Sequence, residues 1–214
     1  MRKIKDNKLD LLEPTLVTTL DLERVYENTP LMEAWLSANG ELNEFDKILL
    51  NEIIAKLVRN VDAWNEEELK MNFISFIIFL ARYDEPIRTY YDREMSAKIG
   101  EYTLLCKADM LLSKGFGELI QTPYFFLHEY KREKKYSGDP VGQMLGGMLI
   151  SQAKNNNGKP MYGCYVQGRF WFFSILIDKQ YVISEAFDST KIIETQKIIM
   201  ILRKMKELIH NTLM

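Results

Sequence analysis

The spacing of apolar residues changes near Ile87, and this change limits the folds that the sequence can adopt. Before it, apolar residues recur every three or four positions with charges between them, which is typical of amphipathic helices. After it, β-branched and aromatic residues follow a period of two, which predicts strands. A chain that carries both patterns packs helices on a sheet, so the expected fold class is α/β or α+β.

Two helices are predicted before this change. The first covers residues 42–61, and the residues expected to form its buried stripe are Leu42, Phe45, Leu49, Ile53, Leu57 and Val61. The second covers residues 64–84, with Asn65 as its cap and three acidic residues at the positive end of the helix dipole. The residues expected to be buried along it are Leu69, Phe73, Ile77 and Leu80.

The rest of the chain predicts a mixed central sheet of about five strands, flanked by helices. Asp139 and Pro140 begin a helix within this part, and Gln167-Gly168 marks a hairpin turn. The predicted strands lie at 87–99, 101–113 and 123–133, with a polar connection at 114–122, a further strand within 180–189 and a closing helix at 190–213. We expect a helical extension at 1–64 and a core at 65–214, together forming one compact unit.

Composition and charge limit the cellular location and the kinds of partner that we expect for this protein. The 214 residues include 28 basic and 30 acidic side chains, so a net charge of −2 gives no overall positive field for nucleic acid. No apolar run is long enough for a bilayer and no signal peptide is visible, so we expect a cytoplasmic protein without membrane contact. Cys106 and Cys164 lie in apolar segments and are interpreted as small buried side chains.

Three charged residues on the predicted strands are candidates for a catalytic site. Glu129 and Lys131 are two positions apart, so they project from one face of their strand, whereas His128 and Tyr130 project from the other. Asp109 lies twenty positions before Glu129 (129 − 109 = 20) in another apolar strand. If these strands are paired, the two carboxylates lie close together and repel each other. A cation must then neutralise them, and Mg²⁺ and Mn²⁺ are suited to this role because they take oxygen ligands.

Lys131 beside such a cation would orient or deprotonate a water and stabilise the charge that develops on a phosphate. This is the chemistry of phosphodiester hydrolysis. The alternative is an ordinary ion pair of Glu129 and Lys131 on a solvated strand, with Asp109 at a strand edge. The two-residue spacing of Glu and Lys alone occurs by chance in most proteins of this size.

The combination of Asp109 with Glu129-x-Lys131, followed at once by a helix, resembles the PD-(D/E)XK nuclease superfamily. The resemblance covers about residues 65–187 and is greatest for the branch found at the N-termini of type I restriction subunits. It implies a restriction-endonuclease-like fold, hydrolysis of DNA and a divalent cation. The superfamily's proline is replaced by Ala108, and the 214 residues include no helicase motor.

Two further residues are assigned by this resemblance. Glu66, at the start of the second helix, matches a metal-ligating glutamate, although a solvated acidic cluster is an equal alternative. Gln143 matches a glutamine that contacts the active site or DNA, but Gly147 replaces the aromatic residue that follows it in some members. An exposed helix residue is the alternative for Gln143. The segment around Gly168 resembles a structural hairpin of the same domains.

Basic residues near the acids are candidates for contacts with the DNA backbone. They are Lys107, Arg132, Lys134 and Lys135, and a solvated strand end is the alternative for the last three. Two functions therefore remain open. One is a nuclease with Glu66, Asp109 and Glu129 on the metal and with Lys131 and Gln143 assisting catalysis. The other is an inactive nuclease-fold module that binds a protein or DNA.

Further expectations concern partners. A homodimer or a protein partner would contact the N-terminal or C-terminal helices, the latter of which has an apolar stripe. A third interpretation is an α/β domain unrelated to nucleic acid.

Overall fold

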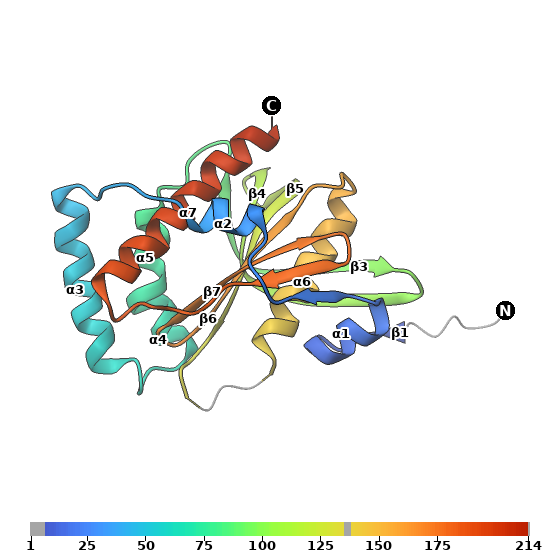
Figure 1. Ribbon diagram of the computed structural model, residues 1–214, viewed down its shortest axis with the longest axis horizontal. Helices are drawn as coiled ribbons and strands as arrows, with labels where there is room; N and C mark the ends of the chain where they lie inside the picture. The colour runs from blue at the N-terminus through green and yellow to red at the C-terminus, as the bar shows by residue number, and fades with distance from the viewer. Residues whose placement is uncertain (1–6, 135–137, 214) are drawn as a thin grey trace.

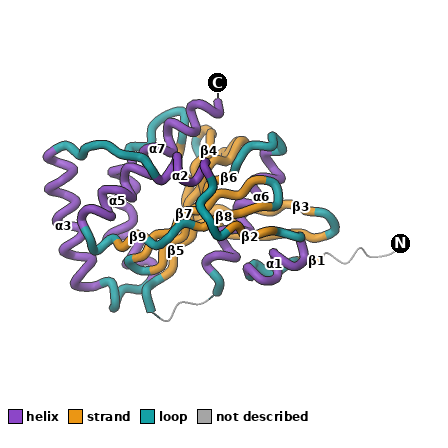
Figure 2. The backbone as a smooth tube through the Cα atoms, viewed as in Figure 1, coloured by secondary structure: helices purple, strands orange, loops and turns teal. Residues whose placement is uncertain are grey.

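A large mixed sheet separates two layers of helices in the computed structural model, which describes residues 7–134 and 138–213 (Figure 1). Figure 2 shows the strands as one central layer with helices outside it. The elements in chain order are β1 (Asn7–Lys8), α1 (Glu13–Leu20), β2 (Glu23–Val25), α2 (Pro30–Leu36), α3 (Glu44–Asn60), α4 (Glu66–Leu69), the π-helical turn η1 (Lys70–Ile74), α5 (Ser75–Ala81), β3 (Arg88–Ile99), β4 (Tyr102–Phe116), β5 (Leu119–Lys131), α6 (Pro140–Asn155), β6 (Met161–Gln167), β7 (Phe170–Ile177), β8 (Gln180–Ile183), β9 (Phe187–Asp188) and α7 (Ile192–Leu213).

The sheet has the strand order β1-β4-β5-β6-β7-β8-β2, with β3 paired to β4 and β9 to β7. β3, β4 and β5 form an antiparallel meander, whereas β5 and β6 are parallel and are joined through α6. A parallel pair needs such a crossover connection, because a tight turn cannot return the chain in the same direction. The mixed α/β architecture with flanking helices agrees with the class expected from the sequence.

Each face of the sheet is covered by its own hydrophobic core. Side chains alternate between the two faces of a strand, so Cys164 and Val166 of β6 enter one core and Tyr165 enters the other. The first core lies under α2, α3, η1, α5 and α7, and the second lies under α1 and α6. In Figure 1 these two groups of helices lie on opposite sides of the strands.

The two predicted N-terminal helices form, with one error in each. In α3 the stripe residues Ile53 and Leu57 are buried, but Phe45 is 64% exposed, and Leu50 takes part in the core instead. Leu69, Phe73, Ile77 and Leu80 are all buried as predicted. Their helix is not a continuous α-helix, however, because the wider turn η1 separates α4 from α5.

The strands are longer and more numerous than the sequence predicted. The polar connection expected at 114–122 is wrong, because β4 continues to Phe116, β5 begins at Leu119, and Gly117 has the positive φ of 56° at the turn between them. The N-terminal segment is also not wholly helical, since β1 pairs with β4 and β2 with β8. The described residues form nine strands instead of about five.

The connections around α6 follow the sequence closely. The Asp139 carboxylate caps this helix by accepting from the Gly142 N–H at 3.0 Å, and its other oxygen accepts from the Glu13 N–H at 2.7 Å, which ties α1 to α6. Gly168 has a φ of 59° in the predicted hairpin turn between β6 and β7. Along the two described ranges, no helix combines the length and apolar character needed to cross a membrane.

Candidate active site

The candidate acids lie where β4 and β5 part. The last paired residues of these strands are Met110 and His128, so the pairing ends just before Asp109 and Glu129 would face each other. We call this place the β4–β5 fork. Asp109 Oδ2 accepts a hydrogen bond of 2.8 Å from the Tyr130 N–H, so a side chain replaces the backbone partner at the fork. β4 and β5 are thus paired neighbours, as the sequence analysis required for the carboxylates to approach.

Glu129 and Lys131 form a buried ion pair. The Lys131 Nζ lies 2.7 Å from the Glu129 Oε1, and the two residues are only 7% and 4% exposed. His128 and Tyr130 are buried in contact with each other, as expected for the opposite face of the strand. The description of Glu129 and Lys131 as a solvated surface pair is therefore wrong.

The electrostatic environment of Glu129 links three acids. Burial raises the pKa of its carboxyl to about 7, the negative charges of Asp109 and Glu66 add to this rise, and the contact with Lys131 opposes it. A carboxylate feels such neighbours only when they are close and poorly screened by water. The fork thus combines the charges of Glu66, Asp109 and Glu129, which lie far apart in the sequence.

Glu66 reaches this environment from the first turn of α4. Its neighbour Glu68 takes part in a capping box, in which the Asn65 side chain accepts from the Glu68 N–H and the Glu68 carboxylate accepts from the Asn65 N–H, each at 2.8 Å. Glu67 and Glu68 are exposed, whereas Glu66 is half-buried. The three acidic residues are therefore not one uniform solvated cluster.

Lys70 is the site residue that sequence analysis missed. Its Nζ lies 2.6 Å from the Asp109 Oδ1. Burial lowers the pKa of Lys70, but the contact with Asp109 outweighs that effect and the net pKa is raised. Lys70 is the first residue of the π-helical turn η1. Turns of this type are rare in proteins, and those that occur are often at functional sites. The spacing of four between Glu66 and Lys70 was the only signal in the sequence.

Gln143 lies in the first turns of α6, as expected, but it is half-buried instead of exposed. Its Oε1 atom is buried and has no hydrogen-bond partner among the residues that the structure describes. A buried amide oxygen without a partner is unfavourable, so it marks a place where a donor is missing. A Cβ atom added to Gly138 would lie 3.2 Å from this oxygen, so Gln143 lies against the segment that follows β5.

The candidate DNA contacts do not form one open basic surface. The Lys107 Nζ lies 3.0 Å from Asp92 and the Lys134 Nζ lies 3.3 Å from Asp62, while Arg132 is half-buried. Lys135 lies outside the described residues. These lysines would have to exchange a carboxylate for a phosphate in order to bind a DNA backbone.

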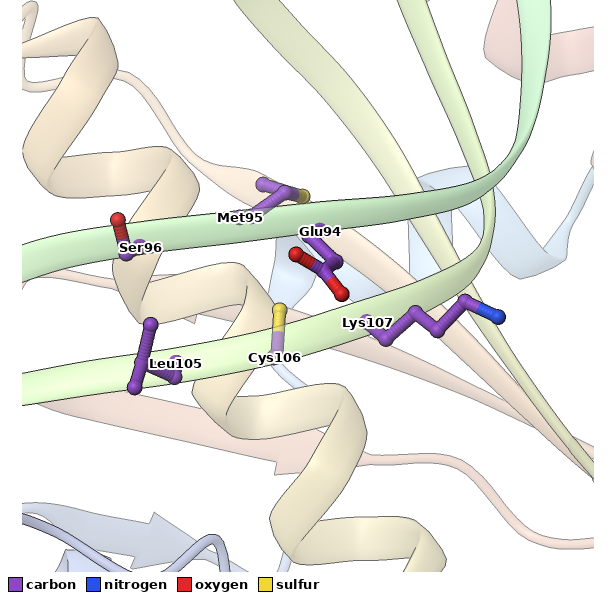
Figure 3. A pocket seen from close by; sticks show the side chains of 6 residues that line it. All are labelled: Glu94, Met95, Ser96, Leu105, Cys106 and Lys107. Carbon is purple, nitrogen blue, oxygen red and sulfur yellow. The ribbon is translucent and has the colours of Figure 1, made fainter.

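A hollow of about 550 Å³ lies on the β3–β4 hairpin (Figure 3). Lys107 is at one end of it and extends away from Cys106 and Ser96. Glu94 is paired with Lys107 across the two strands, so the hollow carries charges of both signs. It therefore has no clear preference for an anionic or a cationic ligand.

The acids do not form a ready-made metal site. Within the described ranges, no three Asp, Glu, His or Cys side chains are gathered closely enough to ligate one ion. The amines of Lys70 and Lys131 contact Asp109 and Glu129 instead. The donor set nevertheless fits a hard divalent cation, because the charges of Asp109 and Glu66 raise the pKa of Glu129, and oxygen atoms are the ligands that Mg²⁺ and Mn²⁺ take.

A second cavity adjoins the fork, and we call it the side cavity. Its volume is about 410 Å³, and it lies between the η1–α5 helix and strands β3 and β4. Asp109, Lys70 and Tyr130 line it, so it shares residues with the candidate site. The fork and the side cavity are therefore parts of one continuous region.

Comparison of the chain with models of known protein families and with curated proteins finds no match.

Proposed function

We propose that this protein is a Mg²⁺- or Mn²⁺-dependent nuclease that hydrolyses phosphodiester bonds of DNA in the cytoplasm. The observation that carries the proposal is the β4–β5 fork, where the charge of Asp109 acts on the carboxyl of the buried pair of Glu129 and Lys131. Burial and the nearby charges of Asp109 and Glu66 raise the pKa of Glu129, and such crowding of acids favours a site that neutralises them with a cation.

The strand arrangement supports a restriction-endonuclease-like fold as part of the same proposal. Strands β3, β4 and β5 are antiparallel neighbours, and the crossover helix α6 leads from β5 to β6, which is parallel to β5. Asp109 lies on the second strand of this unit, and Glu129 and Lys131 lie at the end of the third. This is the order of acid, strand turn, acid and lysine on which the resemblance to PD-(D/E)XK nucleases rests.

Each residue has a distinct role in the proposal. Glu66, Asp109 and Glu129 would hold the cation, which when bound polarises the scissile phosphate and lowers the pKa of water. Lys131 keeps its amine beside Glu129 and stabilises negative charge on the phosphate or orients the attacking water. Gln143 offers its unpaired buried oxygen to a water or another donor. Lys107, Arg132, Lys134 and Lys135 would contact the backbone of the DNA.

Cleavage assays with matched variants test this function. Linear, circular and single-stranded DNA would be incubated with Mg²⁺, Mn²⁺ or EDTA and the wild type, Lys131→Met, Glu129→Gln or Asp109→Asn. We expect metal-dependent cleavage that falls by about 100-fold or more in each variant, because each removes a charge that acts on the transition state. Lys179→Met, which removes an exposed lysine that is paired with Asp21 and has no role in the proposal, is the control and should cut at close to the wild-type rate.

Two results would reject the nuclease. One is the absence of cleavage by folded wild-type protein under all of these conditions. The other is cleavage that survives both Lys131→Met and Glu129→Gln, since that activity would come from elsewhere.

The second candidate function is an inactive nuclease-fold module that binds a protein or DNA. Two observations favour it: Lys70 and Lys131 neutralise the carboxylates without a metal, and α3 exposes Phe45, Ile48 and Val58. Exposed apolar side chains at helical spacing are typical of contact surfaces. Sedimentation of the wild type and of Ile48→Asp would reveal a homodimer through this face, and loss of the dimer only in the variant would support the module.

A further inference from the structure

The side cavity has an apolar wall and a charged end. Met71, Ile74 and Ile78 of the η1–α5 helix form the wall, and Tyr91 of β3 stands at its exposed side with 51% of its surface accessible. Lys70 and Asp109 form the charged end next to the fork. A volume of about 410 Å³ lies within the usual range of about 300–1,000 Å³ for small-molecule sites.

The charges indicate which part of a nucleotide could enter. Asp109 and Asp92 line the cavity and are already paired with Lys70 and Lys107, while Glu67 adds a further negative charge. A phosphate deep inside would be repelled by these carboxylates. A neutral, flat base would instead contact the apolar wall and the tyrosine ring, and its polar edge would find donors and acceptors at the charged end.

We propose that the side cavity is a binding site for one unpaired base of single-stranded DNA. The base packs against Tyr91 and the Met71–Ile74–Ile78 wall, and its phosphate stays outside near the fork. A base within a duplex is stacked and paired, so only an unpaired base can reach such a cavity without an unpairing penalty. This inference rests on the proposed function and gives that function a substrate class: single-stranded or unpaired DNA.

Binding assays without cleavage test the inference. A single-stranded oligonucleotide carrying 2-aminopurine and its blunt duplex would be titrated with wild-type protein in EDTA and in Ca²⁺, with the intact length of the DNA checked on gels. We expect the single strand to bind at least tenfold more tightly than the duplex. The fluorescence of the base should also change on binding, because it leaves its stacked neighbours.

Two variants address the cavity itself. Tyr91→Ala removes the ring, and base stacking on an aromatic side chain predicts a loss of about fivefold or more in single-strand affinity. Ser75→Trp fills the cavity from an exposed helix position and should cause a similar loss. Tyr91→Phe keeps the ring and should bind like the wild type. Tyr26→Ala is the matched control, because Tyr26 is 85% exposed and follows β2, at the far end of the strand order.

The inference is overturned if duplex and single strand bind equally, if neither binds, or if Tyr91→Ala and Ser75→Trp, with wild-type melting temperatures, bind single strands as tightly as the wild type. The result is separable from the nuclease proposal. Single-strand binding that depends on Tyr91 without any cleavage would reject only the nuclease. Cleavage by a protein whose binding ignores both cavity variants would reject only this inference.

Discussion

The Lys70 amine lies 2.6 Å from the Asp109 carboxylate at the point where β4 and β5 part. An internal lysine thus contacts Oδ1 of the carboxylate, and the Tyr130 N–H donates to Oδ2, so a divalent cation would compete with one of these donors. Both side chains are mostly buried, at 25% and 14% exposure, so the contact is only weakly screened by water. The pair neutralises the charge of Asp109 in the absence of metal.

Replacing Lys70 with methionine should therefore strengthen metal binding. The variant leaves Asp109 without its counter-charge, and we expect its affinity for Mn²⁺ to rise by about tenfold, equivalent to roughly 1.4 kcal/mol. Isothermal titration and the electron paramagnetic resonance signal of Mn²⁺ would measure this change. Lys56→Met is the control, because the Lys56 amine contacts Asn72 at an exposed place. Unchanged or weaker Mn²⁺ binding by Lys70→Met would contradict competition between the lysine and the ion.

The raised pKa of Glu129 predicts a pH-dependent stability of the metal-free protein. The carboxyl has an ordinary pKa of 4.5 and one of about 7 in the folded state, mainly because it is buried. Between these values the folded protein holds a proton that the unfolded chain has lost, so stability falls as the pH rises from about 4.5 to 7, by up to roughly 3 kcal/mol. The contribution of Glu129 to stability is at its highest below this window and does not change further above it.

Glu129→Gln removes this titration. Urea unfolding in EDTA at several pH values should show a smaller fall between pH 5 and 8 for Glu129→Gln than for the wild type. The two proteins share all other titrating groups, so the difference between their curves isolates Glu129. Parallel curves would show that this carboxyl titrates normally in the folded protein.

Cys106 should be almost unreactive at neutral pH. Burial, with a smaller effect of Glu129, raises the pKa of its thiol to about 12. At pH 8 about one thiol in 10⁴ would be the reactive thiolate, against about one in ten for a thiol of ordinary pKa 9. Mass spectrometry of the iodoacetamide-treated native protein should find labelling about a thousand times slower than in the urea-unfolded chain. Rapid labelling of the native protein at pH 8 would disprove the shift.

Asp46 should be a main contributor to the stability of the helical layer. Its carboxylate is 1% exposed and contacts Arg82 at 2.6 Å and Arg203 at 2.8 Å, which joins α3 to the end of α5 and to α7. Asp46→Asn leaves both guanidinium groups without their partner and should lower the free energy of unfolding by about 3 kcal/mol. Glu44→Gln, on an exposed pair with Lys47, should change it by less than about 0.5 kcal/mol. Similar effects of the two substitutions in urea unfolding would refute this assignment.

The sequence predicted those parts of the fold that depend on local patterns. The buried stripe of Leu69 and Phe73 follows from helical spacing, and the cap at Asp139 follows from local chemistry. The sequence also placed Asp109 and Glu129 on two strands, but their pairing was only a condition, which the pairing of β4 with β5 meets. Phe45 was predicted to be buried but is exposed, because the spacing of apolar residues does not distinguish a stripe that faces the core from an exposed apolar surface.

The rest depended on contacts between distant segments. The two-residue strand β1 has no pattern of its own and forms only because β4 offers an unpaired edge at Tyr102 and Thr103. The contact of Lys70 with Asp109 joins residues 39 positions apart and depends on a local change of helix type. The alternative of a solvent-exposed ion pair for Glu129 and Lys131 was also wrong. The helices that pack on a strand determine which of its residues are buried, and the local sequence does not show this.

The turn η1 also has a consequence for changes in chain length. An α-helix advances by about 100° per residue, and a π-helical turn accommodates one extra residue, so each residue after it faces where the preceding residue would face in an unbroken α-helix. If residues 70–74 instead formed an ordinary α-turn and α5 kept its core contacts, Glu66 would be rotated away from the fork. Deleting one residue within 71–74 would allow an unbroken α-helix in which α4 and α5 keep nearly their present directions. The type of this turn, and not only the identity of its residues, therefore sets which charges reach the carboxylates.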